Sequence, residues 1–208
     1  RRLAALPPGP RAPATPPIWS APADAAFWNA QAVFRGDLGR IYGVQWRDWQ
    51  KPKNNGKVDQ LKVLIEGLKR DPYGRRHILT AWNPGELDQM ALPPCHMFAQ
   101  FYLRDNKLSC QMYQRSCDMF LGVPFNVASY SLLTHLVAQV CHLKVGEFVH
   151  VLGDAHIYLN HVEQVNEQLK REPLPAPQLH LNPDITDITK FTMDDIQLVN
   201  YSHLGAIK

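Results

Sequence analysis

Residues 96–113 read HMFAQFYLRDNKLSCQMY. Apolar, aromatic and small side chains fill both ends of this stretch, and the polar run RDNK at residues 104–107 separates them. The pattern predicts two β-strands, residues 96–103 and 108–113, joined as a hairpin. The turn lacks the Asn-Gly or Asp-Gly pair typical of the tightest hairpins, so we expect a looser connection. A sheet built around this pair is the centre of the expected fold.

Segments on both sides of the hairpin predict further strands and helices. A helix at residues 58–69 carries apolar side chains at helical spacing and is followed by a strand at residues 77–82. After the hairpin, we expect a helix that Asn126 caps and that runs to about residue 142. A strand at 148–152, a helix at 158–170 and a short strand at 178–181 come next. This order, without strict alternation, predicts an α+β domain with a mixed or antiparallel sheet flanked by helices.

The composition narrows the class of partner. The 208 residues are 45% hydrophobic and 20% charged, which suits one globular domain with a substantial core. The net charge of +3 is too small to indicate a nucleic-acid surface. No stretch approaches the roughly 18 consecutive apolar residues of a membrane span. We therefore expect neither a nucleic-acid nor a membrane partner.

Cysteine and histidine spacing argues against disulfides and metal. No two cysteines form a C-x-x-C pair or a zinc-ligand pattern, and so few in a chain of this length predict a reducing, cytoplasmic setting. The histidines that come closest to a cluster fall on different predicted elements without a carboxylate at ligand spacing, so we expect no metal site. These residues are Cys95, Cys110, Cys117 and Cys141, and His150, His156 and His161.

The first 35 residues differ in composition from the rest. Residues 1–17 hold six prolines among alanines and arginines, which excludes a regular helix or a central strand. Aromatic residues punctuated by glycines predict a loop-rich segment over residues 18–49. We divide the chain into a Pro/Ala-rich lead-in with an irregular aromatic segment, residues 1–35, and a folded body, residues 36–208. The chain begins with arginine instead of methionine, so we expect its natural start to be missing.

Cys95 is the first candidate for chemistry. It follows Pro93 and Pro94, which fix the backbone leading into the expected strand. A reactive cysteine needs a lowered pKa, usually from a nearby cation. The alternative is that Cys95 is a small buried apolar side chain, the more frequent role of cysteine. The residues alone leave both interpretations open.

Two arginine-containing segments are candidates for binding phosphate. Arg75 and Arg76 stand in a turn, and Arg115 with Ser116 stands at a strand end. A guanidinium group can bind a phosphate through two parallel hydrogen bonds. Adjacent arginines in a turn are also common as a solvated basic surface, so this interpretation remains open too.

The run GDAHIY at residues 153–158 is the third candidate, in a loop between a predicted strand and helix. His156 and Tyr158 carry side chains that can hydrogen-bond a sugar hydroxyl. The alternative is that Asp154 is simply the N-cap of the following helix.

Taken together and in order, these segments resemble the thymidylate synthase family. The resemblance covers about residues 36–208. It is carried by GDLG at 36–39 with YG at 42–43, Arg75-Arg76, MALPPCH at 90–96, YQRSCD at 113–118, LGVPFNVASY at 121–130 and GDAHIY at 153–158.

The resemblance implies a reaction and two substrates. A thymidylate synthase methylates dUMP to dTMP, in dTTP biosynthesis, with 5,10-methylenetetrahydrofolate as donor of the one-carbon unit and the hydride. The thiolate of Cys95 would add to C6 of the uracil, which makes C5 a nucleophile. The fold implied is α+β, with one sheet face used for homodimerisation, and no metal is required.

The resemblance also implies a role for each matched residue. Arg115 and Ser116 would bind the phosphate, and Arg75 and Arg76 would reach the partner's site in the homodimer. His156 and Tyr158 would hold the deoxyribose hydroxyl. The full set implied for dUMP is Arg75, Arg76, Gln114, Arg115, Ser116, Cys117, Asp118, Asn126, His156, Ile157 and Tyr158, and that for the folate is Asp118, Gly122 and Phe125.

Asn126 would select the base. Its amide can donate to uracil O4 and accept from N3–H, whereas cytosine presents the reversed pattern. A site built on such hydrogen bonds discriminates strongly. Asn at this position therefore favours a uracil substrate.

Two departures from the family pattern set the alternatives. Before Gly36 we find neither the additional phosphate-binding arginine nor the glutamate that organises proton transfer, and Trp19 or Trp28 is the candidate for stacking on the folate. The family's C-terminal tail is not matched after Lys208, so we expect an incomplete chain that turns over slowly. The alternatives are a pyrimidine nucleotide hydroxymethylase and a truncated, non-catalytic nucleotide-binding module. A Cys-His hydrolase is disfavoured because neighbouring Cys95 and His96 should point to opposite faces of a strand.

Overall fold

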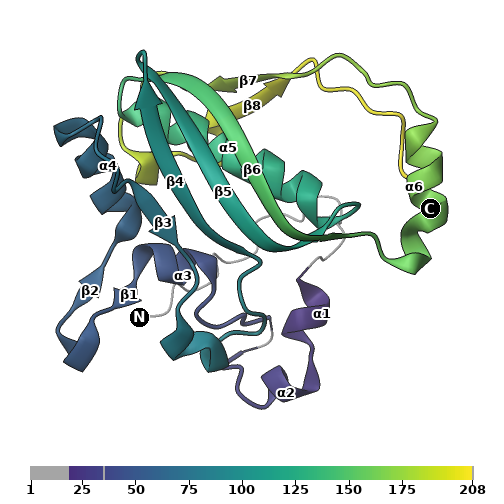
Figure 1. Ribbon diagram of the computed structural model, residues 1–208, viewed down its shortest axis with the longest axis horizontal. Helices are drawn as coiled ribbons and strands as arrows, with labels where there is room; N and C mark the ends of the chain where they lie inside the picture. Colours follow the sequence, from purple (N-terminus) through teal and green to yellow (C-terminus); the bar gives the residue numbers. More distant parts are fainter. Residues whose placement is uncertain (1–18, 35, 208) are drawn as a thin grey trace.

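The computed structural model describes residues 19–34 and 36–207 (Figure 1). Its centre is a four-stranded sheet in the order β3-β4-β5-β6, made of β3 (Ile78–Thr80), β4 (His96–Arg104), β5 (Lys107–Asp118) and β6 (Lys144–His156). The first three strands pair antiparallel and β6 pairs parallel to β5. The expected α+β domain with a mixed sheet is confirmed.

The turn between β4 and β5 is tighter than we expected. The two strands end and begin at Arg104 and Lys107, which pair across the turn and leave only two residues between them. Asp105 and Asn106 take φ values of 49° and 60°, the left-handed conformation that a two-residue hairpin of the primed type requires. The prediction of a looser turn was wrong, because Asp and Asn tolerate this conformation without a glycine.

The long helix α5 (Gly122–Val140) begins earlier than predicted. Leu121 is the N-cap and no side chain caps the helix, but Asp118 holds the turn before it, since its Oδ1 accepts hydrogen bonds from the backbone N–H groups of Phe120 and Leu121 at 3.1 and 3.2 Å. Pro124 is tolerated because a helix's first turn needs no N–H donor. Asn126 therefore lies inside the helix, and its predicted role as the N-cap was wrong.

One face of the sheet packs on α5 and on α4 (Gln60–Arg70) to form the core. Alternate strand residues point into it, as the period of two requires. α4 is capped by Asp59, whose side chain accepts from the Lys62 N–H. The buried members of the cluster include Leu64, Leu68, Leu79, Phe101, Leu108, Met112, Tyr130 and Val137.

The opposite face of the sheet, which faces the viewer in Figure 1 with α5 behind it, carries exposed apolar side chains. Phe98 and Tyr102 of β4 are 40% and 53% exposed, and Val149 of β6 is 41% exposed. The rings of Phe98 and Tyr113 stack, with centroids 6.1 Å apart. We call this surface, with Ile78 and Val151, the open sheet face.

The described N-terminal residues are more ordered than the expected loop. α1 (Ser20–Ala23), α2 (Ala26–Asn29) and α3 (Tyr42–Arg47) are short helices. Trp28 is buried, and its indole N–H donates to the Asp37 carbonyl oxygen at 2.6 Å. Gly39, at a φ of 72°, lies against the Trp28 ring, where a Cβ would not fit. Residues 1–18 of the predicted lead-in lie outside the described residues.

The remaining elements are short or peripheral. β6 extends beyond the predicted 148–152 and includes Asp154, so the interpretation of Asp154 as a helix N-cap was wrong. Among the described residues, no helix is long and apolar enough to cross a membrane. The other elements are β1 (Trp49–Gln50), η1 (Pro52–Asn54), β2 (Lys57–Val58), η2 (Pro84–Gln89), η3 (Leu159–His161), α6 (Val162–Leu169), β7 (Gln178–Leu181), η4 (Ile188–Lys190), η5 (Met193–Asp195) and β8 (Ile196–Val199).

Candidate active site

A cavity of about 610 Å³ lies where β5 and β6 end and α5 begins. The carboxyl ends of parallel strands meet at one edge of a sheet, and here Ser116 pairs with Asp154 and Asp118 with His156. The first turns of α5 close the same edge. The cavity is lined by most of the predicted site residues: Cys95, Gln114, Ser116, Asp118, Gly122, Phe125, Asn126, His156 and Tyr158.

The other predicted residues do not line the cavity in this chain. Arg115 lies beside it, against the backbone that leads to Cys95. Cys117 is buried and its thiol donates to the Gln114 carbonyl oxygen at 3.3 Å. Arg75 and Arg76 are exposed in the loop before β3, and Ile157 is 45% exposed.

Backbone contacts on both sides of Cys95 hold it in the cavity wall. Its N–H donates to the Tyr42 hydroxyl at 2.8 Å, and its carbonyl accepts from the Arg115 N–H at 2.9 Å. Burial raises the pKa of the Cys95 thiol, and the positive charge of Arg115 opposes this rise without cancelling it. The backbone beside the thiol is thus fixed, and Arg115 is the nearby cation that favours the thiolate.

An aromatic cluster behind Cys95 was not anticipated from the sequence. Tyr42 stacks on His96 with centroids 3.8 Å apart and planes 9° apart, and the Nδ1 of His96 is 2.8 Å from the Tyr130 hydroxyl. Trp19 packs edge-on against Tyr42. His96 also lines the cavity, so the expectation that it points away from Cys95 was wrong: Cys95 precedes β4 and is outside its alternation. The YG pair at residues 42–43 was the only signal for Tyr42.

Of the two tryptophans considered for stacking on a folate, Trp19 lines the cavity and Trp28 does not. Trp28 instead packs in the interior beside Gly39. Trp46, Leu92 and Ser129 also line the cavity and were not predicted.

Two hydrogen bonds fix the side chain of Gln114 in the cavity wall. The Nε2 of His150 is 3.0 Å from Gln114 Oε1, and Gln114 Nε2 donates to the Ser116 carbonyl at 2.9 Å. Burial lowers the pKa of His150 and so favours the neutral ring, in which one nitrogen can donate. This arrangement holds the carbonyl of Ser116, which also lines the cavity.

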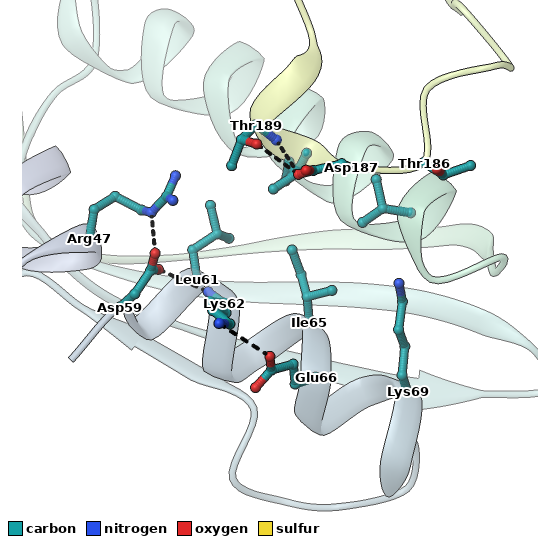
Figure 2. Close-up of a pocket in the computed structure, with 12 residues that line it drawn as sticks. Arg47, Asp59, Leu61, Lys62, Ile65, Glu66, Lys69, Thr186, Asp187 and Thr189 are labelled. Atoms are coloured by element: carbon teal, nitrogen blue, oxygen red, sulfur yellow. Dashed lines mark hydrogen bonds and ion pairs between the residues drawn. The ribbon is translucent and has the colours of Figure 1, made fainter.

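A second cavity, of about 320 Å³, lies between α4 and the segment at residues 186–189 (Figure 2). Its charges largely satisfy each other: Arg47 pairs with Asp59 at 2.9 Å, and Lys62 lies 3.8 Å from Glu66. Asp187 accepts from the backbone and hydroxyl of Thr189. This cavity lacks a thiol or histidine among its lining residues, unlike the one around Cys95.

The fold and the larger cavity define a class of protein. A mixed sheet and the helix α5 present a cysteine, an amide and a strand-end serine to one cavity, an arrangement that suits an enzyme with a cysteine nucleophile. A comparison with protein families matches residues 18–208 to the family described as thymidylate synthase. The chain therefore belongs to the thymidylate synthase family, a family of methyltransferases that use methylenetetrahydrofolate. Within the described part of the chain, no group of three or more His, Cys, Asp or Glu side chains is placed to hold a metal ion.

We predict that His96 makes folding stability depend on pH. Burial and the neighbouring His150 lower the pKa of His96 from 6.5 to about 4. Between these values the unfolded chain binds more protons than the folded one, so stability rises with pH and this contribution is complete above pH 6.5. Urea unfolding measures the free energy of unfolding at pH 7 and at pH 4. Between these two pH values, the His96→Gln variant should lose about 3 kcal/mol less of this free energy than the parent chain. Burial also lowers the pKa values of His135 and His150, and both histidines are present in the parent and in the variant. An equal loss of unfolding free energy in the two chains would therefore contradict the prediction.

Proposed function

We propose that this chain catalyses the reductive methylation of dUMP to dTMP with 5,10-methylenetetrahydrofolate. The observation that carries the proposal is that the Cys95 thiol and the Asn126 amide line the same cavity. The thiolate adds to C6 of the uracil, and C5 forms a bond with the methylene carbon of the folate. C5 then loses its proton, the folate leaves, and a hydride from the reduced folate completes the methyl group. Elimination of Cys95 releases dTMP and dihydrofolate.

The positions of the other residues support one orientation of dUMP in the cavity, with its phosphate at the end of β5 and its deoxyribose at the residues after β6. Arg115 and Ser116 at the end of β5 bind the phosphate, and His156 and Tyr158 after β6 hold the deoxyribose hydroxyl. Their rings meet edge to face with centroids 5.2 Å apart, which supports a shared orientation toward one ligand. Gln114 and Asp118 complete the wall of the nucleotide site.

The folate occupies the mouth of the cavity beside the start of α5. Phe125 is 49% exposed there, and an apolar ring in this position suits stacking on a pterin. Asp118 uses Oδ1 to hold the turn before α5, which leaves Oδ2 for the pterin's N–H groups.

The active form is a homodimer that pairs through the open sheet face. Exposed aromatic and aliphatic side chains over several strands are typical of a protein interface. Gln100, on β4, donates to the Arg75 carbonyl at 3.2 Å and so ties the arginine loop to this face. Face-to-face pairing brings Arg75 and Arg76 to the partner's phosphate site. The four free thiols support a reducing, cytoplasmic location.

We predict that Phe98→Glu on the open sheet face disrupts the dimer. A twofold interface would bury the new carboxylate twice without a partner, and the dissociation constant should rise at least about a hundredfold. Sedimentation velocity measures this change. Met193→Glu in η5, at an 81% exposed position, is the matched control and should leave the dimer unchanged. If the Phe98→Glu chain is as dimeric as the parent, the open sheet face is not the dimer interface.

The reaction itself is tested with 5-fluoro-dUMP and 5,10-methylenetetrahydrofolate. Fluorine at C5 cannot be removed as the proton is, so the reaction stops at a covalent complex of protein, nucleotide and folate. Intact-mass spectrometry should show this adduct in the parent chain and in Cys141→Ala, which removes the other half-buried thiol. The absence of an adduct in both would overturn the proposed reaction.

A further inference from the structure

The guanidinium group of Arg115 is held along one edge and against one face. Along the edge, Nε donates to the Pro94 carbonyl and Nη2 to the Pro93 carbonyl, each at 3.0 Å. Against the face, Cζ lies 5.5 Å from the centroid of the Trp82 ring. The edge and the face together fix both the position and the tilt of the planar group.

The carbonyl edge couples the arginine to the nucleophile. Pro93 and Pro94 directly precede Cys95, and the Arg115 backbone N–H is bound to the Cys95 carbonyl. Nε and Nη2 lie on one side of the guanidinium, so the terminal side with Nη1 remains for a ligand. A single cation is therefore shared by the peptide that carries the thiol and by the end of the cavity assigned to phosphate.

Trp82 contributes a ring face and does not reach the ligand. It follows β3 and is half-buried, and it is absent from the described residues that line the cavity. The neighbouring Ala81 N–H is bound to the Met97 carbonyl at 2.8 Å, which anchors the backbone beside Trp82. A guanidinium over an indole face gains a cation–π attraction that grows as water is excluded. Without the ring, the two carbonyl bonds alone allow the guanidinium to tilt about its edge.

We propose that Trp82 is a positioning residue that, through Arg115, sets both the affinity for the nucleotide phosphate and the reactivity of Cys95. The phosphate half of this statement rests on the proposed function. The thiol half concerns only the free protein and stands without any nucleotide.

The first test compares the binding of dUMP with that of deoxyuridine, which lacks the phosphate, by calorimetry. Trp82→Leu should weaken dUMP binding about tenfold, with little change for deoxyuridine. Trp82→Phe, which keeps an aromatic face, should bind dUMP nearly as well as the parent chain. Trp49→Leu, which removes a half-buried indole in β1 away from Arg115, is the matched control. An equal loss for both ligands marks Trp82 as merely structural and overturns the proposal.

The second test follows alkylation of Cys95 by iodoacetamide as a function of pH, with peptide mass spectrometry to separate it from the other cysteines. The midpoint should rise by about half to one pH unit in Trp82→Leu and stay in place in Trp49→Leu. If Trp82→Leu does not fold, a fluorinated tryptophan at residue 82 keeps the ring's shape and weakens its negative face, and should shift the midpoint in the same direction. An unshifted midpoint in the folded variant overturns the proposal. A parent chain that binds neither ligand would instead count against the proposed function, with the alkylation result still deciding the role of Trp82.

Discussion

Cys95→Ser is expected to abolish the covalent adduct with 5-fluoro-dUMP and to lower dTMP formation by at least about a thousandfold. Serine keeps nearly the same shape, but its hydroxyl does not ionise at neutral pH and is a much weaker nucleophile. The two backbone hydrogen bonds of residue 95, to Tyr42 and from Arg115, do not involve the side chain and should persist. Dihydrofolate absorbance measures turnover, and intact mass measures the adduct.

The control for this loss is Cys141→Ser. Cys141 is also half-buried, at the end of α5, and its substitution should leave both readouts within about twofold of the parent. Thermal unfolding of both variants separates a chemical effect from a loss of folding. Turnover that survives in a folded Cys95→Ser chain would show that another group attacks the ring.

Asn126→Asp is expected to reverse the preference for the base. The carboxylate can only accept hydrogen bonds, so uracil O4 faces a second acceptor and dUMP turnover should fall by about a hundredfold to ten-thousandfold. A protonated carboxyl can donate to cytosine N3 and accept from its amino group, so dCMP should gain. Competition between dUMP and dCMP, with each product resolved by chromatography, measures the ratio.

Asn160→Asp makes the same chemical change at an exposed position of η3. It should leave the ratio of dUMP to dCMP turnover unchanged. If Asn126→Asp lowers turnover of both nucleotides equally, Asn126 supports the start of α5 and does not read the base.

Local patterns predicted the regular elements well. The period of two in β4 and the helical spacing in α4 arise because each element buries one face against the core, and this leaves a repeating apolar pattern in the sequence. The strand at residues 178–181 was predicted at its observed limits. The start of α5 was missed because no capping side chain marks it: Leu121 is the N-cap, and Asp118 holds the preceding turn from the end of a strand.

The candidate site was predictable in part, since the resemblance named most of its residues that line the cavity but not Trp46, Leu92 or Ser129. Its internal contacts were not. Tyr42 and the Cys95 backbone are 53 residues apart, and His96 and Tyr130 are 34 apart, and no spacing rule joins them. Trp82 was also missed, because its face meets Arg115 only once β3, β4 and β5 lie side by side.

The parallel pairing of β5 with β6 has a consequence for how this protein folds. The hairpin of β4 and β5 needs only a two-residue turn, whereas the whole of α5 lies between β5 and β6 along the chain. Closing that longer loop is the slower event. Ser116 lies in β5 and His156 in β6. A folding intermediate in which these strands have not yet paired therefore does not hold the two residues beside each other. Nucleotide affinity recovered during refolding therefore marks the arrival of β6 rather than the formation of the hairpin.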